Sequence, residues 1–222
     1  VLGMVVIFVS HQWLGRAHPD PDMKQFVILQ SFLANMIEGK CIIDTHQFST
    51  IHFGHTGVVT NEDWKVEDAW LWYDYFGVPQ LSKSYDPEAG AALMNAVNSI
   101  PDYVNLCRHF IILCPELEHW SGNMCNYLSW SRRGWCRVED SSRRLHHFGE
   151  PVVMVTAGNQ AMLVCSQAYL SQPVGEAEFT CCALGHTVNG NAIPCDKHKV
   201  AGIMDTLIQG ALRILRGSSA SH

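Results

Sequence analysis

Four short, continuous apolar runs constrain the fold of this chain most. The segments between them space their apolar residues differently. The runs are rich in β-branched and aromatic residues and span residues 4–10, 69–80, 109–114 and 151–157. Continuous apolar runs of this length are typical of strands buried on both faces of a parallel sheet. The pattern predicts an α/β fold of the flavodoxin-like kind, a doubly wound parallel sheet with helices on both faces.

The separating segments divide into predicted helices and one irregular stretch. Residues 23–37 and 87–99 show the apolar spacing of amphipathic helices. Residues 39–66 show no sustained period, and their glycines and polar residues favour an insertion or a hairpin. We therefore assign residues 1–158 to an α/β core that carries this insertion.

The last part of the chain departs from the alternation. Residues 159–222 are predicted to form a C-terminal elaboration that packs on the same domain. Its first half is rich in Cys and His, and the Asn189-Gly190 turn signal favours a β-ribbon there. Residues 197–216 have the apolar spacing of a closing helix.

Composition limits the class of protein. With 222 residues, of which 47% are hydrophobic and 16% charged, the chain can bury the core of one domain. A net charge of −6 argues against a nucleic-acid partner, because affinity for phosphates comes from clustered Lys and Arg. The opening apolar run is too short to span a membrane and lacks the basic flank of a signal peptide. Nine cysteines without the rhythm of a secreted scaffold favour reduced thiols in a cytoplasmic protein.

Polar and aromatic residues lie at, near or just beyond the ends of the predicted strands. Ligands of doubly wound sheets bind beyond the carboxyl ends of the strands, so these residues should converge on one cleft. A helix after the third strand adds Trp135 and Glu139, which lie four residues apart and hence on one helix face. The other members of the predicted cleft are Ser10, His11, Trp13, Asp74 and Tyr75.

Three segments together resemble the TIR domains and the related HET domains. The segment CNYLSWSRRGWCRVEDSSRRL, residues 125–145, resembles the TIR segment in which a Ser-rich, Tyr-containing stretch leads into a Trp-Cys-x-x-Glu helix. Its Arg-Gly-Trp followed by Glu is similar to HET domains. VIFVSH resembles the opening strand of TIR domains, and LWYDYFGVPQ is similar to a HET segment. The matched region covers about two thirds of the chain, and residues 39–66 and 160–196 have no counterpart.

The resemblance implies an activity and assigns roles to residues. Glu139 would be the catalytic residue of a signalling domain that cleaves the nicotinamide–ribose bond of NAD or NADP, by hydrolysis or cyclisation. Ser10, His11, Trp13, Asp74, Tyr75 and Trp135 would bind the nucleotide. NAD would be a substrate, so no cofactor is required. The resemblance also implies a homo-oligomer and a piece of a larger protein with other domains.

The residues leave other interpretations open. The chain could be a non-catalytic module for self-association or protein interaction, or one that senses a nucleotide without cleaving it. Glu139 precedes Arg143 by four residues, the favourable order for a helical ion pair. Cys136, at the start of the same helix, is a weak candidate for a nucleophile.

The Cys/His-rich segment offers a second candidate site. Thiolates and imidazoles are the ligands that zinc prefers. The spacing matches no standard zinc finger, and small buried cysteines in a ribbon are the simpler explanation. Zinc therefore stays a weak prediction for Cys181, Cys182, His186, Cys195 and His198.

Overall fold

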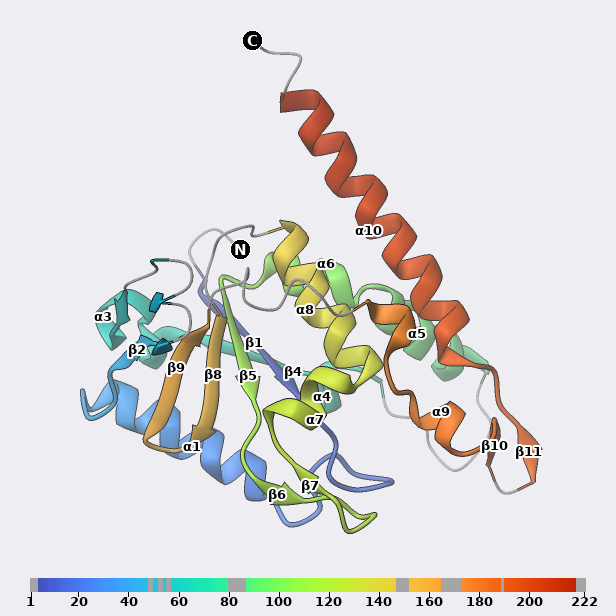
Figure 1. Cartoon of the computed structure of the whole chain (residues 1–222), viewed down its shortest axis with the longest axis horizontal. Coiled ribbons are helices and arrows are strands. Elements are labelled where there is room, and N and C mark those ends of the chain that lie inside the picture. The colour runs from blue at the N-terminus through green and yellow to red at the C-terminus, as the bar shows by residue number, and fades with distance from the viewer. Residues whose placement is uncertain are drawn as a thin grey trace.

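A computed structural model gives the fold of this chain. It describes residues 4–47, 50–51, 54, 57–79, 87–146, 152–164, 173–188 and 190–218. These residues form a seven-stranded sheet with helices on both faces, together with a C-terminal elaboration (Figure 1). The predicted α/β, flavodoxin-like fold is confirmed.

The parallel part of the sheet is built around its first strand. β1 (Val6–His11) pairs in parallel with β4 (Trp70–Tyr73) on one side and with β5 (His109–Leu113) on the other. β8 (Val152–Ala157) then pairs in parallel with β5. Counted along the chain, these four strands have the order 2-1-3-4, which is the start of the flavodoxin-like order.

The other half of the sheet is mixed, so the sheet as a whole is mostly parallel. β9 (Gln160–Val164) returns antiparallel to β8, because only two residues separate the two strands. The division predicted after residue 158 falls inside this hairpin, and the sheet therefore extends to Val164. Beyond β9, the predicted insertion supplies β2 (Ile43–Thr45) and β3 (Val58–Val59).

Alternation along β1 sends its side chains to two separate cores. Ile7 and Val9 lie on the face covered by α1 (Lys24–Ile37), and Phe8 lies on the opposite face. That opposite face is covered by α6 (Ile100–Leu106), α7 (Tyr127–Arg132) and α8 (Gly134–His146). Other helices that precede β5 include α3 (Asn61–Trp64), η1 (Val66–Asp68) and α5 (Pro87–Asn98).

The second predicted strand is shorter than expected, and this matters for the site. β4 ends at Tyr73, and a single helical turn, α4 (Asp74–Gly77), begins directly after it. In this turn the backbone N–H of Val78 donates to the Asp74 carbonyl, and the Asp74 carboxylate accepts a hydrogen bond from the backbone N–H of Tyr75. Residue 80, the end of the predicted strand, lies outside the described residues.

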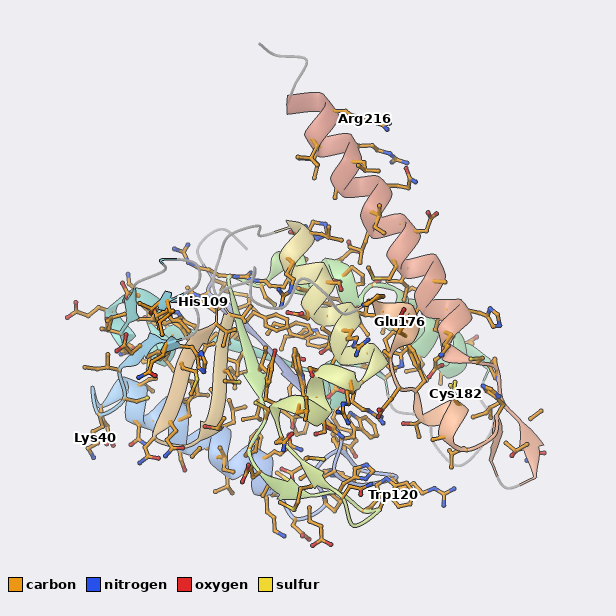
Figure 2. All side chains as sticks on the ribbon, viewed as in Figure 1. Lys40, His109, Trp120, Glu176, Cys182 and Arg216 are labelled. Carbon is orange, nitrogen blue, oxygen red and sulfur yellow. The ribbon has the colours of Figure 1, made fainter. Side chains whose placement is uncertain are left out.

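The C-terminal elaboration packs on α8 through a third apolar cluster. It contains η3 (Val174–Glu176), α9 (Thr180–Ala183) and the predicted ribbon, formed by β10 (Thr187–Val188) and β11 (Asn191–Ala192). The closing helix is α10 (Asp196–Ser218), whose far half projects from the body of the protein toward Arg216 (Figures 1 and 2). None of the helices in the described part of the chain has the length and apolar character that crossing a membrane requires.

A small hairpin precedes α7. It pairs β6 (Leu117–Glu118) with β7 (Met124–Cys125) in an antiparallel arrangement. Asn126 caps α7 by accepting a hydrogen bond from the backbone of Ser129. The Ser129 hydroxyl in turn donates to the Gln12 side chain, which ties the start of α7 to the loop after β1.

Candidate functional site

The end of β1 places two consecutive polar side chains on opposite faces of the sheet. Ser10 follows Phe8 in the alternation and points toward α8, whereas His11 follows Val9 and points toward the α1 side. Ser10 is fully buried and His11 is 6% exposed. The residues predicted to line one cleft therefore form two polar groups at the carboxyl end of β1, one on each face of the sheet.

The first polar group joins Ser10 to Glu139. The Ser10 hydroxyl donates to the Glu139 carboxylate, with Oγ and Oε2 2.5 Å apart. The indole N–H of Trp130 donates to the same hydroxyl across 3.0 Å. An indole can only donate, so this geometry leaves the Ser10 proton for the carboxylate and favours the ionised form of Glu139.

Burial opposes that ionised form. Glu139 is 8% exposed, and burial raises the pKa of its carboxyl to about 8. The hydrogen bond from Ser10 lowers this pKa, and the negative charges of Asp74 and Asp140 raise it further. Near neutral pH the carboxyl is therefore mostly protonated, and a cation brought close to it would draw the proton off.

The second polar group is centred on Asp74. His11 Nε2 lies 2.8 Å from Asp74 Oδ1, and the Trp13 indole N–H donates to Oδ2 across 2.8 Å. Burial works to raise the pKa of Asp74, but the charge of His11 and hydrogen bonds from His11, Trp13 and the Tyr75 backbone outweigh it. The pKa of Asp74 is lowered as a result, and its carboxylate stays ionised.

Tyr73 is the last member of this group and contacts His11. Its hydroxyl lies 3.3 Å from His11 Nδ1, and the two rings stack with centroids 4.2 Å apart. Burial raises the pKa of Tyr73, so its hydroxyl keeps its proton beside the imidazole. Tyr75 contacts both Trp13 and His18 through its ring, which gives the Asp74 carboxylate an aromatic surround.

Trp135 lies apart from these two groups. Its indole N–H donates to Asp196 at the start of α10 across 3.3 Å, and its ring contacts the apolar clusters on both sides of α8. The structure therefore places Trp135 between α8 and the C-terminal elaboration. Its predicted contact with a nucleotide stays a prediction.

The ion pair that helical spacing allowed for Glu139 is not the contact that the structure shows. Glu139 accepts from Ser10, while Arg143 donates to the carbonyl oxygens of Cys107 and Arg108. An ion pair of this spacing does form one residue further on, between Asp140 and Arg144. Burial raises the pKa of Cys136 well above its usual value, which disfavours a thiolate nucleophile there.

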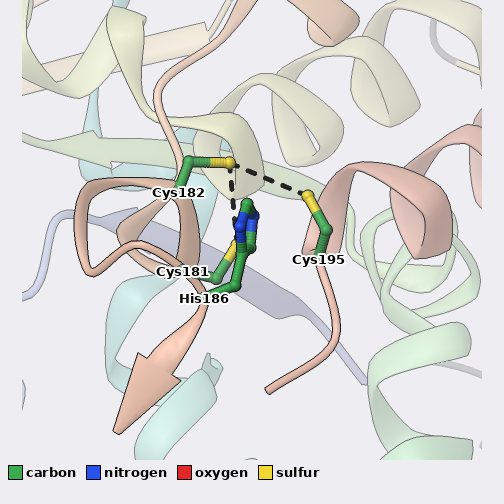
Figure 3. A group of neighbouring side chains, drawn as sticks. All are labelled: Cys181, Cys182, His186 and Cys195. Carbon is green, nitrogen blue, oxygen red and sulfur yellow. Dashed lines mark hydrogen bonds between the residues drawn. The ribbon is translucent and has the colours of Figure 1, made fainter. Parts of the chain in front are cut away.

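Four of the five metal-ligand candidates lie together. Cys181, Cys182, His186 and Cys195 each offer a ligand atom, and these atoms all lie within 4.8 Å of one another (Figure 3). A group of this composition could hold a metal ion. His198 lies outside it, because the first turn of α10 carries that side chain to an exposed position.

Sequence reasoning missed Trp130 and Tyr73 as members of the site. Trp130 was read only as part of the Ser-rich segment, although it is 2% exposed and fixes Ser10. Tyr73 was part of the second predicted strand, residues 69–80, and was given no role in the site. A buried aromatic residue with a polar atom needs a hydrogen-bond partner, and that requirement was the available signal.

Comparisons with known proteins do not assign the chain to a family. No family model matches it, and neither a curated protein nor a solved structure matches it significantly. The TIR/HET resemblance therefore stays a prediction.

Proposed function

We propose that this chain cleaves the nicotinamide–ribose bond of NAD, with Glu139 as the essential carboxylate. The observation that carries the proposal is the position of Glu139. Its carboxylate is held by Ser10 at the end of β1, beside the β1–β5 boundary where doubly wound sheets of this order bind ligands. The resemblance to TIR domains gives the same residue the catalytic role.

The chemistry requires one well-placed carboxylate. The C1′–N bond breaks with its electron pair going to the nicotinamide nitrogen, so nicotinamide leaves as a neutral molecule. The ribosyl carbon becomes positively charged, as in glycoside hydrolysis, and a nearby carboxylate stabilises it. In hydrolysis, water then adds to C1′ and gives its proton to Glu139. The pKa of Glu139 in the protein without NAD is about 8. Binding of the cationic nicotinamide ring close to this carboxyl would lower that pKa and favour the ionised form.

The second polar group supports nucleotide binding. Asp74 is 27% exposed at its side chain and can accept hydrogen bonds from ribose hydroxyls. Trp13 and Tyr75 border it and offer ring faces for a base or for nicotinamide. His11 holds Asp74 in place rather than reaching solvent, since its side chain is 1% exposed.

A non-catalytic interaction module is the second candidate, and one observation favours it. Glu139 is 8% exposed, so a ribosyl group reaches its carboxylate only if Ser10 or the start of α8 moves. In the non-catalytic reading, Trp130, Ser10 and Glu139 serve as a buried connection between β1 and α8. Such a domain would act by binding other copies or other proteins.

The test is release of nicotinamide from NAD and from NADP by the concentrated chain, separated by chromatography. Wild type should release it, and Glu139→Gln and Glu139→Ala should each lose on the order of 100- to 1,000-fold in rate. Glu62→Gln, at an exposed position on α3, is the matched control and should keep full activity. The ratio of linear to cyclic ADP-ribose among the products separates hydrolysis from cyclisation.

Two outcomes would contradict the proposal. No release by concentrated wild-type protein would favour the interaction module. Release that survives both Glu139 substitutions would mean that another residue carries the reaction, and Asp74 would be tested next.

The proposed reaction uses NAD as a substrate and needs no metal. For the separate Cys/His group we infer zinc as the ion, because three thiolates and one imidazole form a donor set that zinc prefers. Cysteines that stay reduced, as zinc ligands must, are typical of a reducing compartment, which supports the cytoplasm as the location.

A further inference from the structure

The distances within the Cys/His group fit a tetrahedral zinc site. The Sγ atoms of Cys182 and Cys195 lie 3.7 Å apart, and those of Cys181 and Cys182 lie 4.0 Å apart. A regular tetrahedron with Zn–S bonds of about 2.3 Å has sulfur–sulfur edges of about 3.8 Å. All four ligand atoms lie within 4.8 Å of one another, so no separation exceeds such an edge by more than about 1 Å, which a side-chain adjustment can close.

Two further observations support an ion among these side chains. His186 Nε2 is buried and has no hydrogen-bond partner among the described residues, and such a nitrogen needs either a hydrogen-bond partner or a metal. The backbone N–H groups of Asp196 and Lys197 donate to the sulfurs of Cys181 and Cys195. Hydrogen bonds of this kind hold the ligands of a metal in place from outside the coordination sphere.

The ligands come from two segments that flank the β10–β11 ribbon. Cys181 and Cys182 lie in α9 and His186 lies just after it, whereas Cys195 immediately precedes α10 (Figure 3). An ion bound to all four side chains would cross-link the start of α10 to α9. α10 contacts α8, the helix that carries Glu139, and Cys181 of α9 belongs to the same apolar cluster as Val138 of α8.

The segment before Cys181 fixes the junction between α7 and α8. The backbone N–H of Gly134 donates to the carbonyl of Glu178, and the Glu178 N–H donates to the carbonyl of Arg132. The Phe179 ring lies so close to Gly134 that a Cβ there would be 2.1 Å from it. At α10, Asp196 accepts from the Trp135 indole.

We propose that Cys181, Cys182, His186 and Cys195 bind one Zn²⁺, which clamps α9 to α10 and thereby holds the start of α8 in position. The clamp is structural and does not depend on the chain cleaving NAD. Its effect on turnover rests on the proposed function, because α8 presents Glu139 to Ser10. Loss of the clamp would loosen the first turns of α8 and leave β1 and α1 in place.

The first test is metal content of the whole chain, purified without chelators and measured by elemental mass spectrometry. Wild type should carry one zinc per chain, and Cys182→Ser, Cys195→Ser and His186→Ala should each lose most of it. The matched controls are His198→Ala, exposed on α10, and Cys41→Ser, buried against α1. Both controls should keep the metal. Wild-type protein without metal that also fails to bind added zinc would overturn the proposal.

Cobalt reports on the ligands independently of folding of the variants. Wild-type protein loaded with Co²⁺ should show thiolate-to-cobalt charge transfer and the visible bands of a tetrahedral ion. A Cys182–Cys195 disulfide in freshly purified protein, seen as two missing thiols, would contradict the site. So would cobalt bands typical of octahedral coordination.

Hydrogen exchange tests the clamp. Removing zinc with a chelator should lower amide protection in residues 134–139, with protection in β1 and α1 unchanged. Full protection of α8 without metal would overturn the clamp. Because these readouts need no substrate, they separate failure of the clamp from failure of the NAD proposal.

Discussion

At the scale of residues, Glu139 combines two opposing influences. Ser10 donates to its carboxylate and favours the ionised form, while burial raises the pKa to about 8 and outweighs that hydrogen bond. Trp130 fixes the hydroxyl from the other side. A carboxyl in this state is typical of active sites, although buried structural networks also produce it.

The raised pKa gives a stability prediction that holds whether or not the chain is an enzyme. Between the unfolded pKa of 4.5 and the folded pKa of about 8, the native state keeps a proton that the unfolded state releases. The free energy of unfolding should therefore fall as pH rises through this window, by up to about 1.4 kcal/mol per pH unit. Glu139→Gln cannot titrate, so its unfolding free energy should depend less on pH.

Urea unfolding at pH values from about 5 to about 9 measures this difference. The curve for Glu139→Gln minus wild type should rise with pH and level off above the folded pKa. Glu62→Gln is the control and should run parallel to wild type. Parallel curves for Glu139→Gln and wild type would mean that Glu139 is not buried as the structure shows.

At the scale of elements, the contact between Gly134 and Phe179 joins α8 to the C-terminal elaboration. A methyl group at position 134 would lie 2.1 Å from the Phe179 ring, so Gly134→Ala should destabilise the protein by about 1–3 kcal/mol despite the better helix propensity of alanine. Gly202→Ala is the control, since no atom lies within 4 Å of its added Cβ. That change in α10 should stabilise by about 0.5–1 kcal/mol.

Thermal and urea unfolding of both variants check this prediction. Phe179→Leu removes part of the ring and should recover part of the loss when combined with Gly134→Ala. A Gly134→Ala variant as stable as wild type would show that Phe179 does not lie against this glycine.

Sequence alone predicted the strand and the helix that carry the site better than it predicted the direction of neighbouring strands and the positions of turns. β1 and α8 were predicted because one is a continuous apolar run and the other has a clear helical period. The antiparallel direction of β9 was not, because a buried strand shows the same apolar run in either direction. The turn at Asp74 was read as strand, since its signal is one side-chain hydrogen bond rather than a period.

The residues of the site were predictable to the extent that topology brings strand ends together. Ser10, His11, Asp74 and Glu139 were named from their places in the chain, and the structure joins them into two pairs. The split between faces follows from alternation at the end of β1, which the prediction of one cleft did not use. The role of Trp130 depends on a contact across 120 residues of chain, and no local pattern encodes it.

At the scale of the whole molecule, α10 stands out because only its first half packs on the rest of the protein. Its first half packs on α8 through Val200, Ile203 and Leu207, and its second half extends beyond the body (Figure 1). Leu212 and Leu215 lie on one side of that second half and are 37% and 67% exposed. Apolar side chains so placed favour association with another helix, and the expected homo-oligomer stays a prediction.

We therefore expect the chain to self-associate through the far half of α10. Sedimentation velocity should show a species larger than a monomer that grows with protein concentration. Leu212→Lys combined with Leu215→Lys should shift the chain to monomer. At protein concentrations too low for association its melting temperature should match that of wild type, because exposed substitutions alter stability by less than about 0.5 kcal/mol. Thr206→Lys, exposed on the other side of the helix, should leave association unchanged. Association that survives the double substitution would place the interface elsewhere, whereas a wild-type monomer at all concentrations would contradict self-association itself.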